Sequence, residues 1–281
     1  MSNKVYFGDN LELLKSLPSE SIDLVYIDPP FNTGKPQKRN FIKTISDVNG
    51  DRVGFSGKTY RTEVSSSASY TDKFDDFIEF IRPRITEIHR ILKSSGSLYF
   101  HIDYREVHYC KVFLDTIFGR ENFLNEIIWA YDYGARATKK WSAKHDNILL
   151  YVKDINKYYF DISEVDRIPY MAPGLVGEEK AARGKTPTDT WWHTIVSPTG
   201  KEKVGYPTQK PLGIINRIIN VSCPKDGLVL DCFAGSGTTG ASALINGRQF
   251  ILADQNQEAI DIMKRRFSNM GQSENVEFRD L

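Results

Sequence analysis

The sequence predicts an α/β protein with a doubly wound, mostly parallel sheet, and three observations lead to this prediction. Short apolar runs end at an acidic residue, as residues 22–27 do before Asp28 and residues 228–230 do before Asp231. Segments with apolar residues at helical spacing separate these runs, an alternation typical of parallel sheets with crossover helices. A glycine-rich loop joins the run at 228–231 to the next helix, where open α/β sheets bind their ligands.

The individual elements follow from the period of the apolar residues. An apolar stripe from about residue 74 to residue 92 predicts a helix, with a kink or break at Pro83 because proline lacks the backbone donor. The expected strands cover residues 4–7, 22–27, 97–102, 126–131, 147–152, 228–231 and 249–253. The expected helices cover residues 11–17, 74–92, 106–118, 211–221, 238–245 and 257–267.

Composition describes an ordinary soluble protein in a reducing compartment. The chain has 281 residues, of which 40% are hydrophobic and 26% charged, and no apolar run resembles a signal peptide or a membrane span. Its three cysteines are odd in number and show no C-x-x-C spacing, so we expect a reduced cytosolic setting. The net charge of +1 neither supports nor excludes nucleic acid as a partner, since phosphate binding needs a local basic face.

Two regions lack clear periodicity. Residues 35–71 form an expected mobile or functional insertion, and residues 154–205 form an expected aromatic-rich recognition region. Residues 1–34 with 72–153, and residues 206–281, are expected to form the first and last parts of one α/β domain. Basic residues in the insertion and in a second loop around Trp141 are candidates for phosphate contacts. They are Lys35, Lys38, Arg39, Arg136, Lys139, Lys140 and Lys144. A solvated insertion and a solvated hairpin loop remain the simpler alternatives.

The stretch Asp28-Pro29-Pro30-Phe31 ends the strand at 22–27 and is the first candidate site. The two prolines lack backbone donors and hold the chain extended, so carbonyls here are left to accept other hydrogen bonds. A carboxylate, a fixed carbonyl and an aromatic ring together suit a flat heterocycle that carries an amino group. A strand that merely ends in a rigid turn is the alternative interpretation.

The second candidate site is the loop at residues 235–240, which has the pattern G-x-G-x-x-G after a strand and before a helix. The acidic residue Asp254 lies 254 − 235 = 19 positions further on, at the end of the next expected strand. Glycines let the backbone approach a ligand, and the acid can hold a ribose diol. A nucleoside-type cofactor is predicted, and NAD and S-adenosyl-L-methionine fit the pattern equally well.

Three segments resemble known motifs. The D-P-P-[YF] motif of methyltransferases acting on amino groups of nucleic-acid bases is matched by residues 28–34. Their F-x-G-x-G cofactor loop is matched by residues 231–239, although the family often has proline where Cys232 stands. The T-Q-K-P segment before that loop is matched by residues 206–211. This motif order resembles the β class of DNA adenine-N6 and cytosine-N4 methyltransferases, over nearly the whole chain except 35–71 and 155–205.

The resemblance implies a Rossmann-like methyltransferase fold with permuted motif order, S-adenosyl-L-methionine as cofactor, and double-stranded DNA as substrate. Asp28 and Pro29 are implied to accept hydrogen bonds from the target amine, and Phe31 to stack on the flipped base, with Pro30 completing the catalytic motif. The implied cofactor residues, which also include the catalytic acid, are Asp9, Asp28, Thr208, Lys210, Asp231, Phe233, Ala234, Gly235, Ser236, Gly237, Thr238, Thr239, Asp254 and Gln255. Asp280 is a rival of Asp9 for the cofactor's adenine.

Several alternatives stay open at this point. Cytosine-N4 methylation is the near rival of adenine-N6 methylation, and the family tends to carry serine in place of Asp28 for cytosine. A dehydrogenase would leave the residues around Asp28 unexplained, and a non-catalytic nucleic-acid-binding subunit would retain both motifs without turnover. RNA is a weaker substrate candidate. A homodimer and a partner restriction endonuclease are possible partners, and we expect no metal, since the five histidines show no ligand spacing.

Overall fold

The computed structural model describes residues 3–31, 37–46, 52–53, 59–70, 76–134, 136–197 and 200–281. The chain divides into two compact units, of which the larger comprises Met1–Pro29 and Ile78–Leu281 and the smaller comprises Pro30–Phe77. None of the helices in the described ranges is long and apolar enough to cross a membrane.

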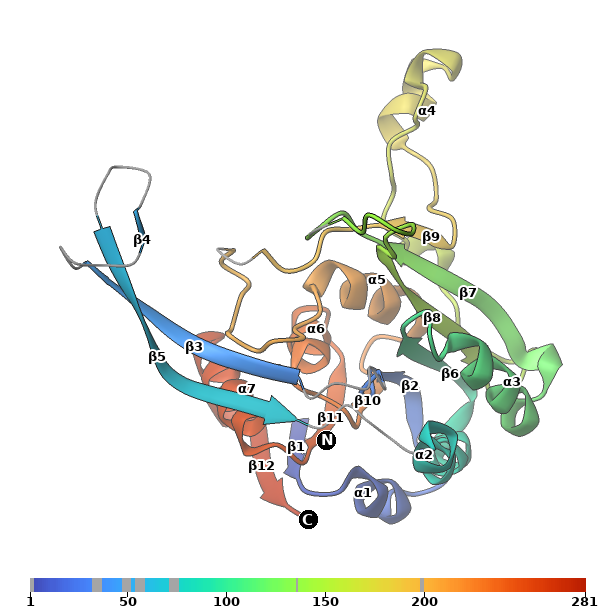
Figure 1. Cartoon of the computed structure of the whole chain (residues 1–281). Coiled ribbons are helices and arrows are strands. Elements are labelled where there is room, and N and C mark those ends of the chain that lie inside the picture. Colours follow the sequence, from blue (N-terminus) through green and yellow to red (C-terminus); the bar gives the residue numbers. More distant parts are fainter. Residues whose placement is uncertain are drawn as a thin grey trace. The chain divides into compact units, whose positions relative to one another are not determined.

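The larger unit is built on a nine-stranded sheet with the order β12-β1-β11-β10-β2-β6-β8-β7-β9 (Figure 1). Strand β8 runs antiparallel to both of its neighbours, and the other pairs in this sheet are parallel. The predicted α/β fold with a mostly parallel sheet is therefore confirmed. The strands are β1 Asn3–Phe7, β2 Ile22–Ile27, β6 Leu92–Ile102, β7 Phe123–Ala130, β8 His145–Val152, β9 Thr190–Trp192, β10 Leu228–Asp231, β11 Gln249–Asp254 and β12 Val276–Asp280.

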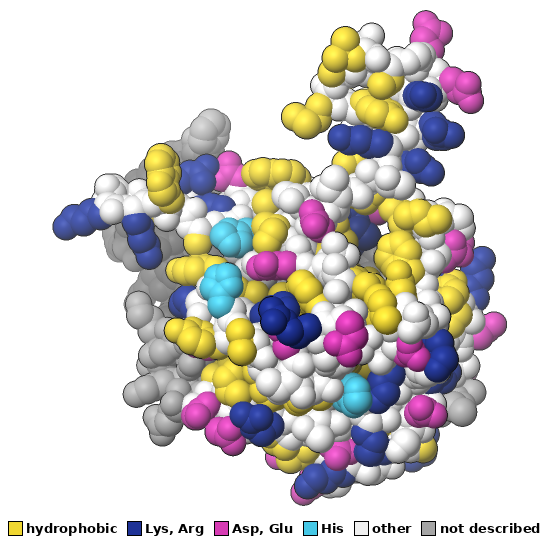
Figure 2. Space-filling view, turned by 90° about the vertical axis from the view of Figure 1, so that its right-hand side faces the viewer, with side chains coloured by type: hydrophobic (Ala, Val, Ile, Leu, Met, Phe, Trp, Pro, Cys, Tyr) yellow, Lys and Arg dark blue, Asp and Glu magenta, His cyan; other side chains and the backbone are white. Residues whose placement is uncertain are grey.

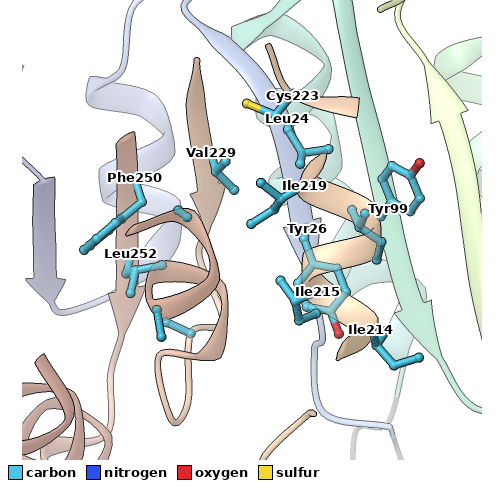
Figure 3. Packing of buried hydrophobic residues seen from close by; sticks show 14 of the residues in the cluster. Leu24, Tyr26, Tyr99, Ile214, Ile215, Ile219, Cys223, Val229, Phe250 and Leu252 are labelled. Atoms are coloured by element: carbon cyan, nitrogen blue, oxygen red, sulfur yellow. The ribbon is translucent and has the colours of Figure 1, made fainter. Parts of the chain in front are cut away.

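Helices lie on both faces of this sheet. One face packs against α5, α6 and α7, which bury Leu24, Tyr26 and Val229 in a common core (Figure 3). Helices α1 and α2 contact each other, since Arg90 of α2 donates to the carbonyl of Leu14 in α1. The helices are α1 Asn10–Ser16, α2 Phe77–Ile91, α3 Val107–Phe118, α4 Glu178–Arg183, α5 Leu212–Ser222, α6 Thr238–Ile245 and α7 Gln257–Asn269. Short 3-10 turns cover Arg120–Asn122, Ile162–Glu164, Pro173–Leu175 and Ser273–Asn275.

The alternation of side chains along the strands places several polar residues on one face. Tyr26, Tyr99 and Val229 point into the core under α5, and successive residues of a strand point to opposite faces. The residues two positions later therefore share that face, at the carboxyl ends of β2, β6 and β10. They are Asp28, His101 and Asp231.

The smaller unit corrects one expectation. Residues 35–71 showed no clear periodicity, but they contain β3 Gln37–Ser46, β4 Arg52–Val53 and β5 Thr59–Tyr70 in an antiparallel sheet of order β3-β5-β4. The charged residues Arg61 and Glu63 alternate with Tyr60, Thr62 and Val64, which is the period of a strand, but the serine-rich residues 65–69 that follow obscure this pattern.

Two boundaries in the larger unit also differ from expectation. The break at Pro83 is wrong, because α2 continues through it to Ile91. Ile81, Ile85 and Ile88 are fully buried on either side, and their burial offsets the one helical hydrogen bond that proline removes. Strand β6 begins at Leu92 rather than residue 97, since Leu92 already pairs with Ile22 of β2.

Residues 154–205 are largely irregular, with α4 and β9 as their longest regular pieces apart from 3-10 turns. The segment around α4 projects from the larger unit (Figure 1), and its base is closed by a bridge between Ile168 and Lys185. Met171 and Leu175 are exposed there, and Figure 2 shows hydrophobic and basic side chains close together on this projection.

Candidate active site

Asp28 sits immediately after β2, where the prolines stop the strand from pairing further. Its Oδ2 accepts a hydrogen bond from the ammonium of Lys210, and the two side chains are 14% and 12% exposed. Its Oδ1 is buried and has no hydrogen-bond partner in the described part of the chain. A buried carboxylate oxygen without a donor is costly, so this atom is prepared to accept a hydrogen bond from a bound amine. Pro30 and Phe31 belong to the smaller unit, so their roles at this site stay predictions.

Lys210 is held in place by its own segment. The side chain of Gln209 is buried, where it donates to the carbonyl of Glu202 and accepts from the backbone N–H of Val204. The carbonyl of Lys210 accepts a hydrogen bond of 3.1 Å from the hydroxyl of Thr238 at the start of α6. The T-Q-K-P segment therefore ties the lysine beside Asp28 to the glycine-rich loop.

A second polar group lies behind Asp28. The imidazole of His101 is fully buried, and its Nδ1 lies 2.7 Å from the hydroxyl of Tyr26 and 3.9 Å from Asp28 Oδ1. Its Nε2 lies 3.3 Å from Oδ2 of Asp146, whose Oδ1 accepts a 3.2 Å hydrogen bond from the hydroxyl of Tyr131. Strands β2, β6, β8 and β7 thus each contribute to one connected polar chain.

The charge state of this chain follows from its surroundings. Burial raises the pKa of Asp146. The hydrogen bond to His101 and the charges of that ring and of Lys210 lower it by a larger amount, so the pKa lies below its usual value. Asp146 is therefore a carboxylate at neutral pH. Burial, followed by the charge of Asp28, raises the pKa of Tyr26, and burial with the charge of Asp146 raises the pKa of Tyr131. Both hydroxyls remain protonated.

The glycine-rich loop follows β10 and leads into α6. Gly235 and Gly237 have φ values of +50° and +70°, a left-handed region that side chains with a Cβ disfavour. A Cβ on Gly237 would lie 2.6 Å from Cγ of Met263 in α7. Both glycines are therefore required by conformation, and the second also by the close approach of α7. The buried Arg266 of α7 donates to the carbonyl of Ser236 and to the hydroxyl of Thr238, and burial lowers the pKa of Arg266 to about 10.

Asp231 anchors this loop at its start. Its Oδ1 accepts a 3.0 Å hydrogen bond from the backbone N–H of Phe233, and its Oδ2 accepts a 2.5 Å hydrogen bond from the hydroxyl of Thr239. Burial, with smaller contributions from the charges of Asp28 and Asp254, raises the pKa of Asp231 to about 7 against these two donors. The sequence placed this residue in the cofactor site, and in the structure it fixes the loop's backbone from inside.

Asp254 ends β11 and faces the same loop. Its Oδ2 accepts from the backbone N–H of Gly235 at 2.8 Å, and its Oδ1 accepts from that of Asn256 at 2.9 Å. Burial raises its pKa, while these backbone donors act in the opposite direction. Each oxygen retains a second lone pair. An acid at this strand end beside a left-handed glycine turn fits the ribose and adjoining chain of a nucleoside cofactor.

Asp9 and Asp280 occupy different settings. Asp9 is the N-cap of α1, accepting from the backbone N–H of Leu11 at 2.9 Å, and it also accepts from Arg84 at 3.1 Å. Arg84 donates in addition to the side chain of Asn10 at 2.6 Å. Asp280 is exposed at the end of β12. The role of Asp9 in cofactor binding stays a prediction, now with the helix cap as an observed function.

Other predicted residues lie at the surface. Thr208 and Gln255 are exposed. In the loop between β7 and β8, Arg136, Lys139 and Lys140 are exposed and Trp141 is 98% exposed, whereas Lys144 is half-buried. Arg136 pairs with Asp132 at 2.5 Å, and Lys144 donates to the carbonyl of Tyr133. Lys35 lies outside the described residues, and of Lys38 and Arg39 only their place in β3 is described. Their contacts with DNA remain predictions.

Sequence reasoning missed His101, Asp146 and Arg266. His101 received no role beyond its place in the expected strand at 97–102, although alternation from Tyr99 places it on the face and at the edge where Asp28 lies. Asp146 starts an antiparallel strand, and Arg266 lies one turn before the end of an ordinary amphipathic helix. No local pattern distinguishes either of these two residues.

Comparison with known proteins gives consistent matches over most of the chain. The sequence model of a DNA methylase family, the N6/N4 methyltransferases, matches residues 22–265. Type II methyltransferase M.ScaI of Streptomyces caespitosus is 28% identical over 281 residues, covering 96% of this chain and 82% of that protein. DNA adenine methyltransferase YhdJ of Escherichia coli strain K12 is 30% identical over 275 residues, covering 93% of this chain and 81% of that protein.

Solved structures share the fold. The M1.HpyAVI–SAM complex superposes with a TM-score of 0.60 at 20% identity, covering 94% of this chain and 98% of that chain. PvuII DNA methyltransferase, described as cytosine-N4-specific, superposes with a TM-score of 0.63 at 17% identity, covering 100% of this chain and 95% of that chain. At these identities the likeness establishes the architecture and leaves the substrate to other arguments.

Proposed function

The chain belongs to the N6/N4 family of DNA methylases, which take their methyl group from S-adenosyl-L-methionine, and from this membership we propose that it methylates the N6 amine of adenine in a specific DNA sequence. The observation that carries the proposal is the buried Oδ1 of Asp28, which has no donor in the described part of the chain. It lies at the carboxyl end of β2, and the neighbouring strand β10 leads into the glycine-rich loop. An acceptor for an amine and a loop for a nucleoside cofactor thus end adjacent strands.

The proposed chemistry needs a better nucleophile than the free base offers. The exocyclic nitrogen of adenine is weakly nucleophilic because its lone pair is delocalised into the ring. Hydrogen bonds from its two N–H groups to Asp28 Oδ1 and to the Pro29 carbonyl favour a tetrahedral nitrogen whose lone pair points out of the ring plane. The bound cofactor supplies an electrophilic methyl group on a sulfonium.

The carboxylate of Asp28 has two further effects in this mechanism. Its negative charge stabilises the positive charge that develops on the attacking nitrogen. The hydrogen bonds also fix the orientation of the amine, and orientation of two bound reactants is a large part of such catalysis. Because the amine is inaccessible inside a duplex, the base must be flipped out, at a cost of a few kcal/mol. Phosphate contacts by the basic segments at 35–61 and 136–144 would offset that cost.

Two arguments favour adenine. The resemblance associates an aspartate at the position of Asp28 with adenine and a serine with cytosine, and the relative YhdJ is named a DNA adenine methyltransferase. Cytosine-N4 methylation is the second candidate, since PvuII DNA methyltransferase shares the fold and both amines require the same acceptors. We propose residues 154–205 as the target-recognition region, because its projection around α4 exposes hydrophobic and basic side chains together.

The direct test is nucleoside mass spectrometry of plasmid DNA from cells that express the protein, beside the variant Asp28→Ala. N6-methyladenine is expected with the native protein and not with the variant, while purified Asp28→Ala still binds S-adenosyl-L-methionine. Asp115→Ala is the matched control, since Asp115 is also a largely buried carboxylate paired with a lysine, Lys111, but lies on α3 away from the site.

Each other result has a defined meaning. N4-methylcytosine would retain the mechanism and overturn the choice of base. Cofactor binding without any methylated base in DNA or RNA would indicate a non-catalytic subunit. Loss of cofactor binding together with retained turnover in Asp28→Ala would contradict the role given to Asp28. Loss of activity in Asp115→Ala as well would attribute the effect of Asp28→Ala to damaged folding.

A further inference from the structure

The hydrogen-bonded side chains next to Asp28, from Tyr26 through His101 to Asp146, are more polar than the packing of these strand ends requires. His101 is fully buried between Tyr26 and Asp146, and its ring contacts the edge of the Trp129 indole, with ring centroids 5.6 Å apart. Burying an imidazole and a carboxylate beside a second carboxylate costs free energy, which a packed apolar residue at position 101 would avoid. This arrangement therefore calls for an explanation in chemistry rather than in stability.

The proton positions in this chain follow from its members. The Asp146 carboxylate can only accept, so Nε2 of His101 carries a proton that points toward it. The Tyr26 hydroxyl is protonated and donates to Nδ1 at 2.7 Å, so in the neutral ring Nδ1 has a lone pair. That lone pair lies 3.9 Å from Asp28 Oδ1, the oxygen proposed to accept from the target amine.

Methyl transfer releases a proton that a closed site must place. When the amine nitrogen forms its bond to the methyl carbon, it becomes positively charged. One of its N–H bonds then breaks, the proton forms an O–H bond with Asp28 Oδ1, and the nitrogen is neutral again. Protonation would cancel the charge that Asp28 presents to Lys210, whose side chain is 12% exposed. A largely enclosed ammonium without its carboxylate is strongly unfavourable, which gives Asp28 a reason to pass the proton on.

We infer that the His101–Asp146 pair accepts the proton that the target amine transfers to Asp28. The Asp28 O–H bond breaks, the His101 Nδ1–H bond forms, and the Asp28 carboxylate again faces Lys210. The Tyr26 hydroxyl stops donating to Nδ1 and accepts from it instead. The 3.9 Å gap closes to about 2.9 Å, a usual hydrogen-bond length, with a shift of about 1 Å. His101 acts on the amine through Asp28 and is therefore a positioning residue; the inference rests on the proposed function.

The charges around His101 favour this transfer. Asp146 of β8 stabilises an imidazolium and itself accepts a hydrogen bond from the hydroxyl of Tyr131, the residue that follows β7. Asp28, which follows β2, is negative before the amine proton arrives and again after it leaves. Lys210, from the segment before α5, opposes the imidazolium but is paired with Asp28. Tyr26 of β2 remains protonated. The Asp231 carboxyl of β10 is protonated below about pH 7 and adds negative charge only above it.

The test compares His101→Gln with the native protein and with Tyr99→Phe. Glutamine retains an amide that can donate to Asp146 but cannot take up a proton near neutral pH. Tyr99→Phe is the matched control, because Tyr99 lies two residues before His101 on β6 and the substitution also removes one buried hydrogen bond. That bond joins the Tyr99 hydroxyl to the Ser222 hydroxyl at 2.7 Å. Binding of S-adenosyl-L-methionine and of DNA should stay within about threefold in both variants. Single-turnover methyl transfer should fall about 10²-fold in His101→Gln and stay unchanged in Tyr99→Phe.

The pH profile separates proton acceptance from a purely structural role. The native rate should fall toward acidic pH along a single limb, because a ring already protonated at Nδ1 cannot accept a further proton. His101→Gln should lack that limb, and Asp146→Asn should move it to lower pH because the imidazolium loses its carboxylate. A slower His101→Gln that retains the limb, or native rates in this variant, would overturn the inference. If His101→Gln fails to bind cofactor, the pH profile of Asp146→Asn tests the inference instead. A limb that moves to lower pH supports it, and a limb at the native position overturns it.

A second readout needs no catalysis. Long-range ¹H–¹⁵N spectra of histidine-labelled, cofactor-free protein at pH 8 should show His101 as the neutral Nε2–H tautomer with an unprotonated Nδ1. A ring protonated at Nδ1 would contradict the inference. Absence of any base methylation by the native protein would instead refute the proposed function, whereas normal native methylation together with a normal His101→Gln variant would refute this inference alone.

Discussion

Asp231→Asn tests whether a carboxyl group at the start of the cofactor loop stays protonated near neutral pH. Asp231 is buried, and the pKa of its carboxyl is raised from 3.8 to about 7. Asparagine has the same shape and retains both contacts in principle. Its oxygen accepts from the Phe233 backbone N–H, and its amide donates to the Thr239 hydroxyl, which can accept as well as donate.

The magnitude follows from linkage between proton binding and folding. Below pH 3.8 the carboxyl is protonated in both states, so it has no pH-dependent effect on stability. Between pH 3.8 and about 7 the unfolded chain loses this proton and the folded protein keeps it, so rising pH favours unfolding. A shift of roughly 3 pH units, at ~1.4 kcal/mol per unit, corresponds to about 4 kcal/mol, and the loss is complete above pH 7.

The assay is urea unfolding followed by circular dichroism at several pH values from 4.5 to 8.5, for the native protein and for Asp231→Asn. Other acids titrate in both proteins, so the informative quantity is the difference between their unfolding free energies. That difference should change in favour of the variant by up to about 4 kcal/mol as pH rises to 7, then level off. A difference that is constant across this range would refute the raised pKa and the protonated carboxyl.

Three further results are expected. Asp254→Asn should weaken S-adenosyl-L-methionine binding, measured by calorimetry, by ~1.5–3 kcal/mol, the contribution of a hydrogen bond to a charged group. An unchanged affinity would mean that the cofactor's ribose does not contact Asp254. Gly237→Ala should lower the melting temperature more than Gly247→Ala. Both glycines have similar positive φ, but a Cβ collides with Met263 only at Gly237. An equal fall in melting temperature in both variants would mean that backbone strain alone causes it. Neutralising the three lysines of the loop between β7 and β8 should flatten the salt dependence of DNA binding by up to about 3 in slope, and an unchanged slope would indicate a solvated loop without phosphate contacts. These lysines are Lys139, Lys140 and Lys144.

The sequence predicted the acids at strand ends because each follows an apolar run that could be recognised locally. Asp28, Asp231 and Asp254 all lie where the alternation of strands and helices placed them. Pairing with distant residues could not be predicted in the same way. Lys210 donates to Asp28 across 182 positions, whereas the resemblance implied a contact of this lysine with the cofactor. The cofactor contact stays a prediction.

The direction of β8 explains why Asp146 was missed. In a parallel strand an acid near the amino end lies at the edge opposite the ligand, so residue 146 carried no signal at the start of its strand. Because β8 runs antiparallel to β6, its first residues lie at the edge where β6 ends, and Asp146 meets His101 there. Strand direction depends on the connection through residues 131–144, and no local pattern in that loop fixes it.

The position of the site follows from topology rather than from motif order. From β2 the chain continues through α2 to β6, whereas from β10 it continues through α6 to β11 on the opposite side. The pair β2–β10 is therefore the point where the winding of the sheet reverses, and the loops after these two strands diverge. Divergence leaves room for a ligand between them, with Asp28 on one side and the glycine-rich loop on the other. Asp28, the proposed amine acceptor, and the glycine-rich loop thus become neighbours although about two hundred positions separate them, because the reversal point is defined by strand order and not by position in the sequence.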